Sequence, residues 1–201
     1  MNLLRNSLSI FFILLLAGCA INSKLNLIDK EQLLLEHLES WNEFQADGIV
    51  TVNYDNFVFR KNINIKKTSD IFKITVYDSG IFGMKPEPFL TVKIDSLIQI
   101  KTQSAEPEFF ALDRFPGLQF FLKPLQLLKF KNQIIRNNIL NFDENTTIRF
   151  SEEMKIKSIK QLSKEFSIDF FYETDLTGIE VWQNKIDLIK IEIDKITRKR
   201  D

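Results

Sequence analysis

Cysteine and histidine are nearly absent from this chain, which has one of each among its 201 residues. The single cysteine, Cys19, has no partner for a disulfide within the chain. Zinc sites need clusters of cysteine, histidine and carboxylate ligands, and hydrolytic triads need a histidine beside the nucleophile. His37 stands alone between Glu36 and Leu38, and we expect it to be a half-exposed helix residue. The sequence therefore predicts no enzyme, with no catalytic residues, no metal and no cofactor.

The chain also lacks an excess of either charge. Lys and Arg together number 27, as do Asp and Glu, so no basic surface favours nucleic acid as a partner. The basic residues Arg60, Lys61, Lys66 and Lys67 are interpreted mostly as the solvent-exposed face and end of a strand. With only 6 glycines there is no Gly-rich phosphate loop. Phenylalanine, in contrast, occurs 19 times.

The first twenty residues have the pattern of an export signal. Arg5 precedes the apolar run 8–16, which is too short to span a bilayer comfortably, and the segment ends in Leu16-Ala17-Gly18-Cys19. This ending resembles the lipobox of bacterial lipoproteins, in which the cysteine is acylated and becomes the first mature residue. The alternative is an ordinary signal peptide with a chance cysteine. We expect a signal peptide over 1–18, a lipidated tether over 19–28 and one domain over 29–201.

The mature chain begins with one helix and continues in strands. Asp29 is the expected N-cap of a helix that ends near Ala46, with Leu34 and Leu38 on its apolar face. From Gly48 onward, apolar and polar residues alternate in short segments, which is typical of an antiparallel sheet with one apolar face. Strands are expected over 48–54, 57–66, 72–77, 90–94, 98–100, 147–150, 156–162, 166–172, 178–182 and 186–193, with another near Ile134.

Two irregularities interrupt this alternation. The segment 118–130 is rich in Leu and Phe without a period of two, and Pro124 suits the first turn of a helix. The pair Leu188-Ile189 predicts a β-bulge in the last strand. The residues around Arg198 are expected to form a solvated tail.

Together these elements predict a mainly β fold with some helix. A single antiparallel sheet of about ten strands must curl or be covered. We expect it to form an unclosed barrel, with the N-terminal helix and the short helices covering its concave side. Such a barrel either packs a dry core or encloses a lipid-sized cavity. If it is hollow, alternation selects the lining residues Val52, Tyr54, Phe59, Ile74, Val92, Phe166, Ile168 and Phe170.

The segment Trp41-x-x-Phe44-x-Ala46-x-Gly48-x-Val50, together with the order of elements, resembles LolB, the outer-membrane receptor of the lipoprotein-localisation pathway. The resemblance implies an unclosed barrel that accepts lipoprotein acyl chains from a LolA-like periplasmic carrier. LolB-like proteins present an exposed apolar residue in a loop after the third strand, and Ile81-Phe82 occupies that place here. Phe82 either points outward for membrane insertion or folds back onto the core. The longer Lys85-Pro86-Glu87-Pro88 connection departs from the family pattern.

Two functions are consistent with these features. The first is a receptor, anchored by its N-terminal lipid to the periplasmic face of the outer membrane, that inserts lipoproteins into it; Ala20 after the cysteine favours that membrane. The second is a lipid-anchored structural or assembly module of the envelope with a filled core. An envelope hydrolase is disfavoured because no nucleophile and base occur together. A monomer is expected in either case.

Overall fold

The computed structural model describes residues 27–54, 57–78, 86–112, 119–184 and 186–198. The predicted signal peptide, Cys19 and the Ile81-Phe82 loop lie outside these ranges. Helices occur at Leu27–Ser40 (α2), Gln119–Leu122 (α3) and Lys131–Asn137 (α4), with 3₁₀ helices at Pro124–Phe130 (η3) and Leu162–Lys164 (η4). The strands are Phe44–Tyr54 (β1), Phe57–Thr68 (β2), Ile71–Tyr77 (β3), Pro88–Ile94 (β4), Leu97–Thr102 (β5), Glu108–Ala111 (β6), Ile139–Asn141 (β7), Thr146–Phe150 (β8), Ile156–Gln161 (β9), Phe166–Tyr172 (β10), Leu176–Gln183 (β11) and Ile186–Arg198 (β12).

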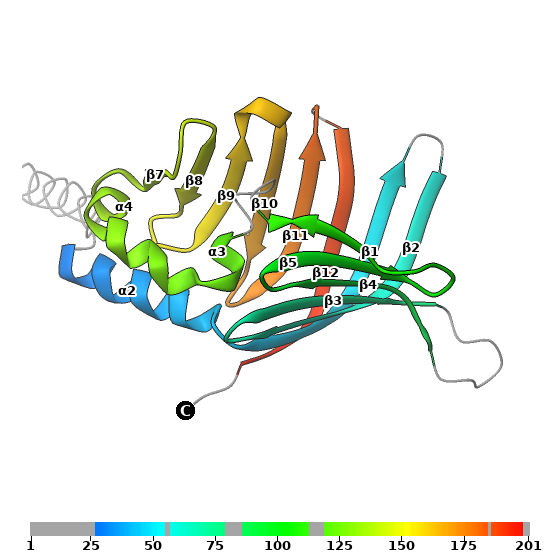
Figure 1. The fold of residues 1–201 in the computed structure, drawn as a ribbon. Coiled ribbons are helices and arrows are strands. Elements are labelled where there is room, and N and C mark those ends of the chain that lie inside the picture. Colours follow the sequence, from blue (N-terminus) through cyan, green and yellow to red (C-terminus); the bar gives the residue numbers. More distant parts are fainter. Residues whose placement is uncertain (1–26, 55–56, 79–85, 113–118, 185, 199–201) are drawn as a thin grey trace, which may run out of the picture.

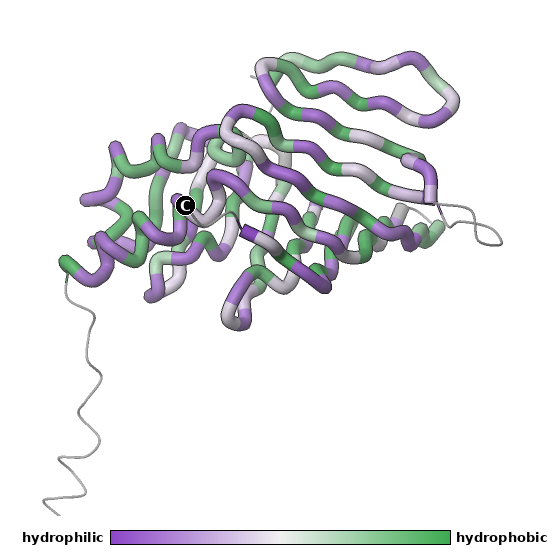
Figure 2. The backbone as a smooth tube through the Cα atoms, turned by 90° about the horizontal axis from the view of Figure 1, so that it is seen from below, coloured by the Kyte–Doolittle hydropathy of each residue, from purple (hydrophilic) through white to green (hydrophobic). Residues whose placement is uncertain are grey.

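All twelve strands form one antiparallel sheet, and the sheet does not close. Its order is β6-β5-β4-β3-β2-β1-β12-β11-β10-β9-β8-β7, so β6 and β7 are its two edges. Figure 1 shows β3 to β6 curling in front of β11 and β12, while β7 to β9 lie to the side. Figure 2 shows hydrophobic and hydrophilic residues alternating along the strands, as a sheet with one apolar face requires. The predicted fold class is therefore confirmed.

The helices cover only one part of the concave side. α2 packs against η3 and α4, and α3 contacts β3. In Figure 1 all of them lie toward the β7–β10 end of the sheet. Pro124 stands in the first turn of η3, as the sequence predicts.

An aromatic cluster joins the helices to the sheet. The indole of Trp41, which follows α2, lies 5.6 Å between ring centroids from each of Phe44, Phe121 and Phe170. These rings come from β1, α3 and β10, so one side chain connects three elements. Each such aromatic contact contributes about 0.5–1.5 kcal/mol beyond its buried area.

Several local predictions were wrong. The first helix ends at Ser40, not near Ala46, and Asp29 lies within its first turn instead of capping it. Ile134 belongs to α4 and not to a strand, because a short apolar run fits both periods and only packing decides. β6 was not predicted at all. The bulge near Leu188 is confirmed by a register shift between β11 and β12.

Arg198 is part of β12 and not of a solvated tail. Its guanidinium donates to both carboxylate oxygens of Asp175 and to the carbonyl of Ser40 at the end of α2. Burial raises the pKa of Asp175, but these hydrogen bonds outweigh it and the pKa is lowered. The sequence could not reveal this ion pair, because Asp175 and Arg198 come together only through the sheet.

Candidate functional site

The concave face carries rows of apolar side chains that cross many strands. One row consists of residues that are successive partners in the pairing of neighbouring strands: Phe59, Val52, Ile189, Val181, Ile168, Ile159, Ile148 and Leu140. A second row links Ile65, Ile74, Val92 and Ile100 across β2 to β5. Because partners in an antiparallel sheet point to the same side, each row forms a continuous apolar strip.

Burial changes along the first row. Ile168 is 7% exposed and Leu140 is 0% exposed, whereas Phe59, Val52, Ile189 and Val181 are only partly buried. The residue types are equivalent, so the difference comes from what covers them. The helices lie over the β7–β10 end and leave the other end uncovered. The concave side is thus divided into a helix-covered core and an open apolar face.

We define the open face by its partly buried apolar side chains on the strands at both sides of the concavity. They are Val52, Phe59, Ile74, Leu90, Val92, Ile100, Phe110, Phe166, Val181 and Ile189. Val52, Phe59, Ile74, Val92 and Phe166 are among the candidates that the sequence selects. The other five were missed, although Leu90 and Ile100 stand in predicted strands with the correct alternation.

Three further candidates lie elsewhere. Ile168 and Phe170 are in the helix-covered core, where the Phe170 ring meets Trp41. The backbone of Tyr54 pairs with Phe57 at the end of β1, and its side chain lies outside the described part of the structure. The loop residues Ile81 and Phe82, and the acylation candidate Cys19, are also outside it.

One end of the open face is bounded by an aromatic pair. The rings of Phe59 and Phe89 lie 5.6 Å apart between centroids, although β3 separates their strands in the sheet. Phe89 can take part because the pairing of β3 with β4 shifts register beside it, between Val76 and Tyr77. Alternation alone would have placed Phe89 on the outer face, which is why sequence reasoning did not select it.

Two lysines interrupt the apolar face of β2. The ammonium of Lys61 forms an ion pair with Asp78 and lies 5.8 Å from the centroid of the Phe59 ring. Lys67, which the sequence assigned to the solvent face, is 2% exposed and donates to the backbone carbonyls of Thr68 and Ser69. Burial lowers its pKa, while the nearby Asp70 opposes the shift. The prediction for Lys67 was wrong because its position in the pleat turns it inward.

His37 was also predicted wrongly. It is 8% exposed, and its Nε2 atom accepts a hydrogen bond of 3.0 Å from the backbone N–H of Ile156. Burial, reinforced by the positive charges of Arg198 and Lys155, lowers its pKa to about 3. The neutral imidazole accepts a backbone hydrogen bond from β9 and so joins α2 to the sheet.

A polar cleft of about 580 Å³ lies beside His37, between the side of α2 and the β10–β11 turn. Lys155, Asp175 and Arg198 line it together with Glu36 and Glu153. Lys155 is paired with Glu153, and Arg198 with Asp175, so both basic side chains of the cleft already have an acidic partner. None of the open-face residues lines this cleft. Among the described residues no three His, Cys, Asp or Glu side chains are grouped so that they could hold a metal ion.

No helix in the described ranges has both the length and the apolar character needed to span a bilayer. No protein-family model matches the sequence, and no curated protein matches it.

Two solved structures resemble the fold at low identity. One is a LolA superfamily protein from Nitrosomonas europaea, with a TM-score of 0.45 and 9% identity over 86% of this chain and 94% of that one. The other is a putative outer membrane lipoprotein-sorting protein domain from Vibrio parahaemolyticus, with a TM-score of 0.46 and 7% identity over 87% of this chain and 94% of that one. Likenesses of this degree say nothing of what this chain binds.

Proposed function

We propose that this protein is a lipid-anchored envelope lipoprotein whose open face receives the acyl chains of other lipoproteins. Cys19 carries the anchor, a LolA-like periplasmic carrier delivers the cargo, and the cargo passes into the outer membrane. The observation that carries the proposal is the part of the concave face that the helices leave uncovered. Uncovered apolar surfaces are characteristic of binding sites, and a curved strip of partly buried apolar side chains suits flexible hydrocarbon chains.

Transfer of an acyl chain needs no chemical step. Each buried CH₂ group contributes about 0.8 kcal/mol, so a chain moves to whichever site buries more of it. The open face offers partial burial, which is enough to compete with a carrier yet weak enough to release the chain into a bilayer. This property fits a receptor that passes its ligand onward.

The first test is binding of a solvatochromic fatty-acid probe to the folded domain. Phe59→Glu places a charge in the open face and should abolish binding while the far-UV circular dichroism stays unchanged. Phe109→Glu is the matched control, because it makes the same change at a phenylalanine of β6 that is 60% exposed. Phe109 is not part of the open face, which includes its neighbour Phe110 instead. Binding should survive this change.

Two outcomes contradict the proposal. If the wild-type domain takes up no probe, the face is closed in solution and a structural or assembly module becomes the better interpretation. If both glutamate variants bind as well as the wild type does, the probe site lies elsewhere. A second experiment then tests transfer, by asking whether a lipoprotein loaded on a soluble carrier moves to the domain.

A further inference from the structure

Three neighbouring strand connections end in exposed apolar side chains. They join β1 to β2, β11 to β12 and β9 to β10, and they lie at the same end of the strands. Phe57 and Val58 stand just after the first, Ile186 just after the second, and Leu162 begins the third. All four side chains are between 62% and 68% exposed. In Figure 1 the ends of the strands that carry these side chains point toward the upper margin. We call these four residues the apolar tips.

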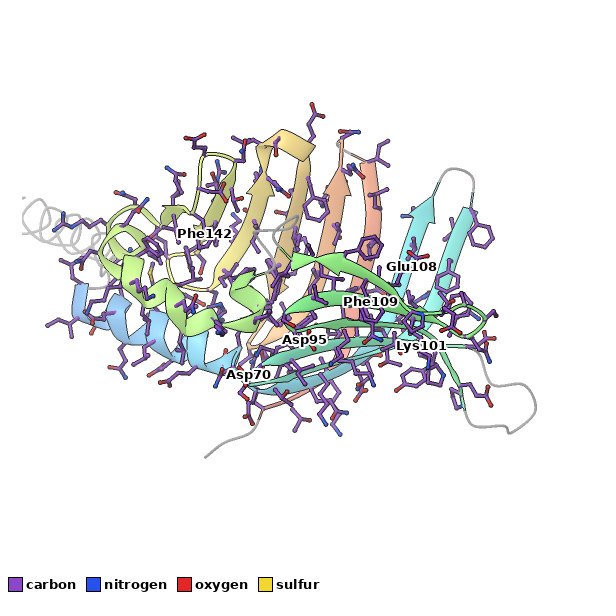
Figure 3. The ribbon with its side chains drawn as sticks, in the orientation of Figure 1. Asp70, Asp95, Lys101, Glu108, Phe109 and Phe142 are labelled. Atoms are coloured by element: carbon purple, nitrogen blue, oxygen red, sulfur yellow. The ribbon has the colours of Figure 1, made fainter. Side chains whose placement is uncertain are left out.

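The connections at the opposite end of the strands contain several carboxylates. The turns after β2, β4, β8 and β10 contain Asp70, Asp95, Glu152, Glu153, Glu173 and Asp175, against the single basic residue Lys155. Figure 3 labels Asp70 and Asp95 at this end of the strands, near the helices. Four of these carboxylates are ion-paired: Asp95 with Lys93, Glu152 with Lys30, Glu153 with Lys155 and Asp175 with Arg198. Apolar side chains at this end, namely Ile71, Leu97 and Phe171, are 36–46% exposed and so are less exposed than the apolar tips.

The exposure of Phe57 and Val58 restricts what can cover them. Adjacent residues of a strand point to opposite faces, so a folded partner protein pressed against one face of the hairpin would leave the other side chain in water. A fluid apolar phase that surrounds the tip covers both at once. The lipid interface of a membrane is such a phase, and aromatic and aliphatic side chains are favoured there.

Basic residues stand behind each tip. Lys160 precedes Leu162 by two residues, Arg60 follows Phe57 by three, and Lys190 follows Ile186 by four. At about 3.3 Å per residue they lie roughly 7–13 Å behind the tips, which is comparable with the depth of a lipid headgroup layer. Arg60 and Lys190 share the carboxylate of Glu192, and Glu180 lies opposite Lys190 in the pairing of β11 with β12, so Lys160 supplies the positive charge that meets lipid phosphates.

We propose that the apolar tips contact the membrane surface directly. This goes beyond the proposed function, because the contact needs neither acyl-chain binding nor the predicted Ile81-Phe82 insertion. The contact would set the orientation of the domain on the membrane. The end of the strands that carries the apolar tips would face the lipid.

The test measures the depth of single positions on vesicles. Every described helix and strand lies within residues 27–198, so the domain 27–201 retains all of the described strand pairings, and it contains no cysteine. Each variant carries one introduced cysteine with an environment-sensitive fluorophore, at Val58→Cys or Ile186→Cys for the tips and at Ser96→Cys for the opposite end of the strands. An N-terminal histidine tag holds the domain on phosphatidylethanolamine–phosphatidylglycerol vesicles that contain a nickel-chelating lipid.

At both tip positions the fluorescence emission should shift to the blue and be quenched by quenchers attached to the lipids. The fluorescence of the label at Ser96→Cys should not change. Serine at both Phe57 and Val58 should reduce quenching of the label at Ile186→Cys at least tenfold. Phe171→Ser, which removes another exposed phenylalanine beside an acidic turn, should leave it unchanged. Folding of each variant is checked by circular dichroism.

The proposal is overturned if all three labels respond equally, if only Ser96 responds, or if none does. It is also overturned if the tip labels shift without vesicles as the protein concentration rises, because a second copy of the chain would then cover the tips. The Phe59→Glu variant should lose fatty-acid binding but keep the same pattern of fluorescence quenching on vesicles. Failure of the proposed function and failure of the membrane contact can therefore be told apart.

Discussion

The stability of this protein should fall steeply between pH 7 and pH 5 because of His37. In the folded chain its pKa is lowered to about 3 by burial first and by the charges of Arg198 and Lys155 second, with Asp175 opposing them. In the unfolded chain the imidazole has its ordinary pKa of 6.5. Below pH 6.5 the unfolded state therefore binds a proton that the folded state does not.

The direction and the magnitude of the change in stability follow from this difference between the two pKa values. The stabilisation is fully present above pH 6.5 and is lost progressively as the pH falls toward 3, at about 1.4 kcal/mol per pH unit. Between pH 7 and pH 5 the free energy of unfolding should decrease by about 2 kcal/mol, a large share of the 5–15 kcal/mol typical of a domain. Protonation of Nε2 would also remove the acceptor of the Ile156 N–H, so the folded state has no easy way to accept the proton.

The assay is urea unfolding of the domain at pH 7, 6 and 5, followed by tryptophan fluorescence. A loss of this size lowers the midpoint by about 1 M urea. The control is His37→Gln, which does not titrate but still offers an oxygen to the Ile156 N–H. His37 is the only histidine in the chain, so the difference between the two pH slopes isolates it. Equal slopes for wild type and variant would refute the reasoning.

Two further predictions concern packing. Gly48→Ala should destabilise the domain by about 3 kcal/mol, since a Cβ there would lie 2.0 Å from the carbonyl oxygen of Glu192; Gly178→Ala, with a nearest contact of 3.3 Å, should cost much less in the same thermal unfolding experiment. Ile148→Ala in the helix-covered core should cost about 2–5 kcal/mol, whereas Val92→Ala on the open face should cost about 1 kcal/mol or less. Equal losses at Ile148 and Val92 in urea would mean that the open face is packed in solution.

The strands could be read from the sequence because their signal is local. Side chains alternate between the two faces of a strand whatever surrounds it. For this reason β10 was predicted with its observed bounds of Phe166–Tyr172, and the bulge at Leu188 could be recognised as an interruption of the alternation. The open antiparallel architecture follows, since so many one-faced strands must share one curled sheet.

Where the period was ambiguous or the partner distant, the sequence misled. The apolar run around Ile134 fits a strand as well as a helix, and packing against α2 makes it helical. Arg198 looked like part of a basic tail until the sheet brought it to Asp175. Lys67 and His37 looked solvated because charged and polar residues usually are.

What the sequence by itself determined is which side chains share the concave face; what the tertiary structure decided is which of them are covered. Ile168 and Val181 are pairing partners on that face, yet Ile168 is buried and Val181 is only partly so. Residue type and alternation cannot separate them. Exposure depends on where the helices come to rest, and that position is set by distant contacts such as those of Trp41 with Phe121 and Phe170.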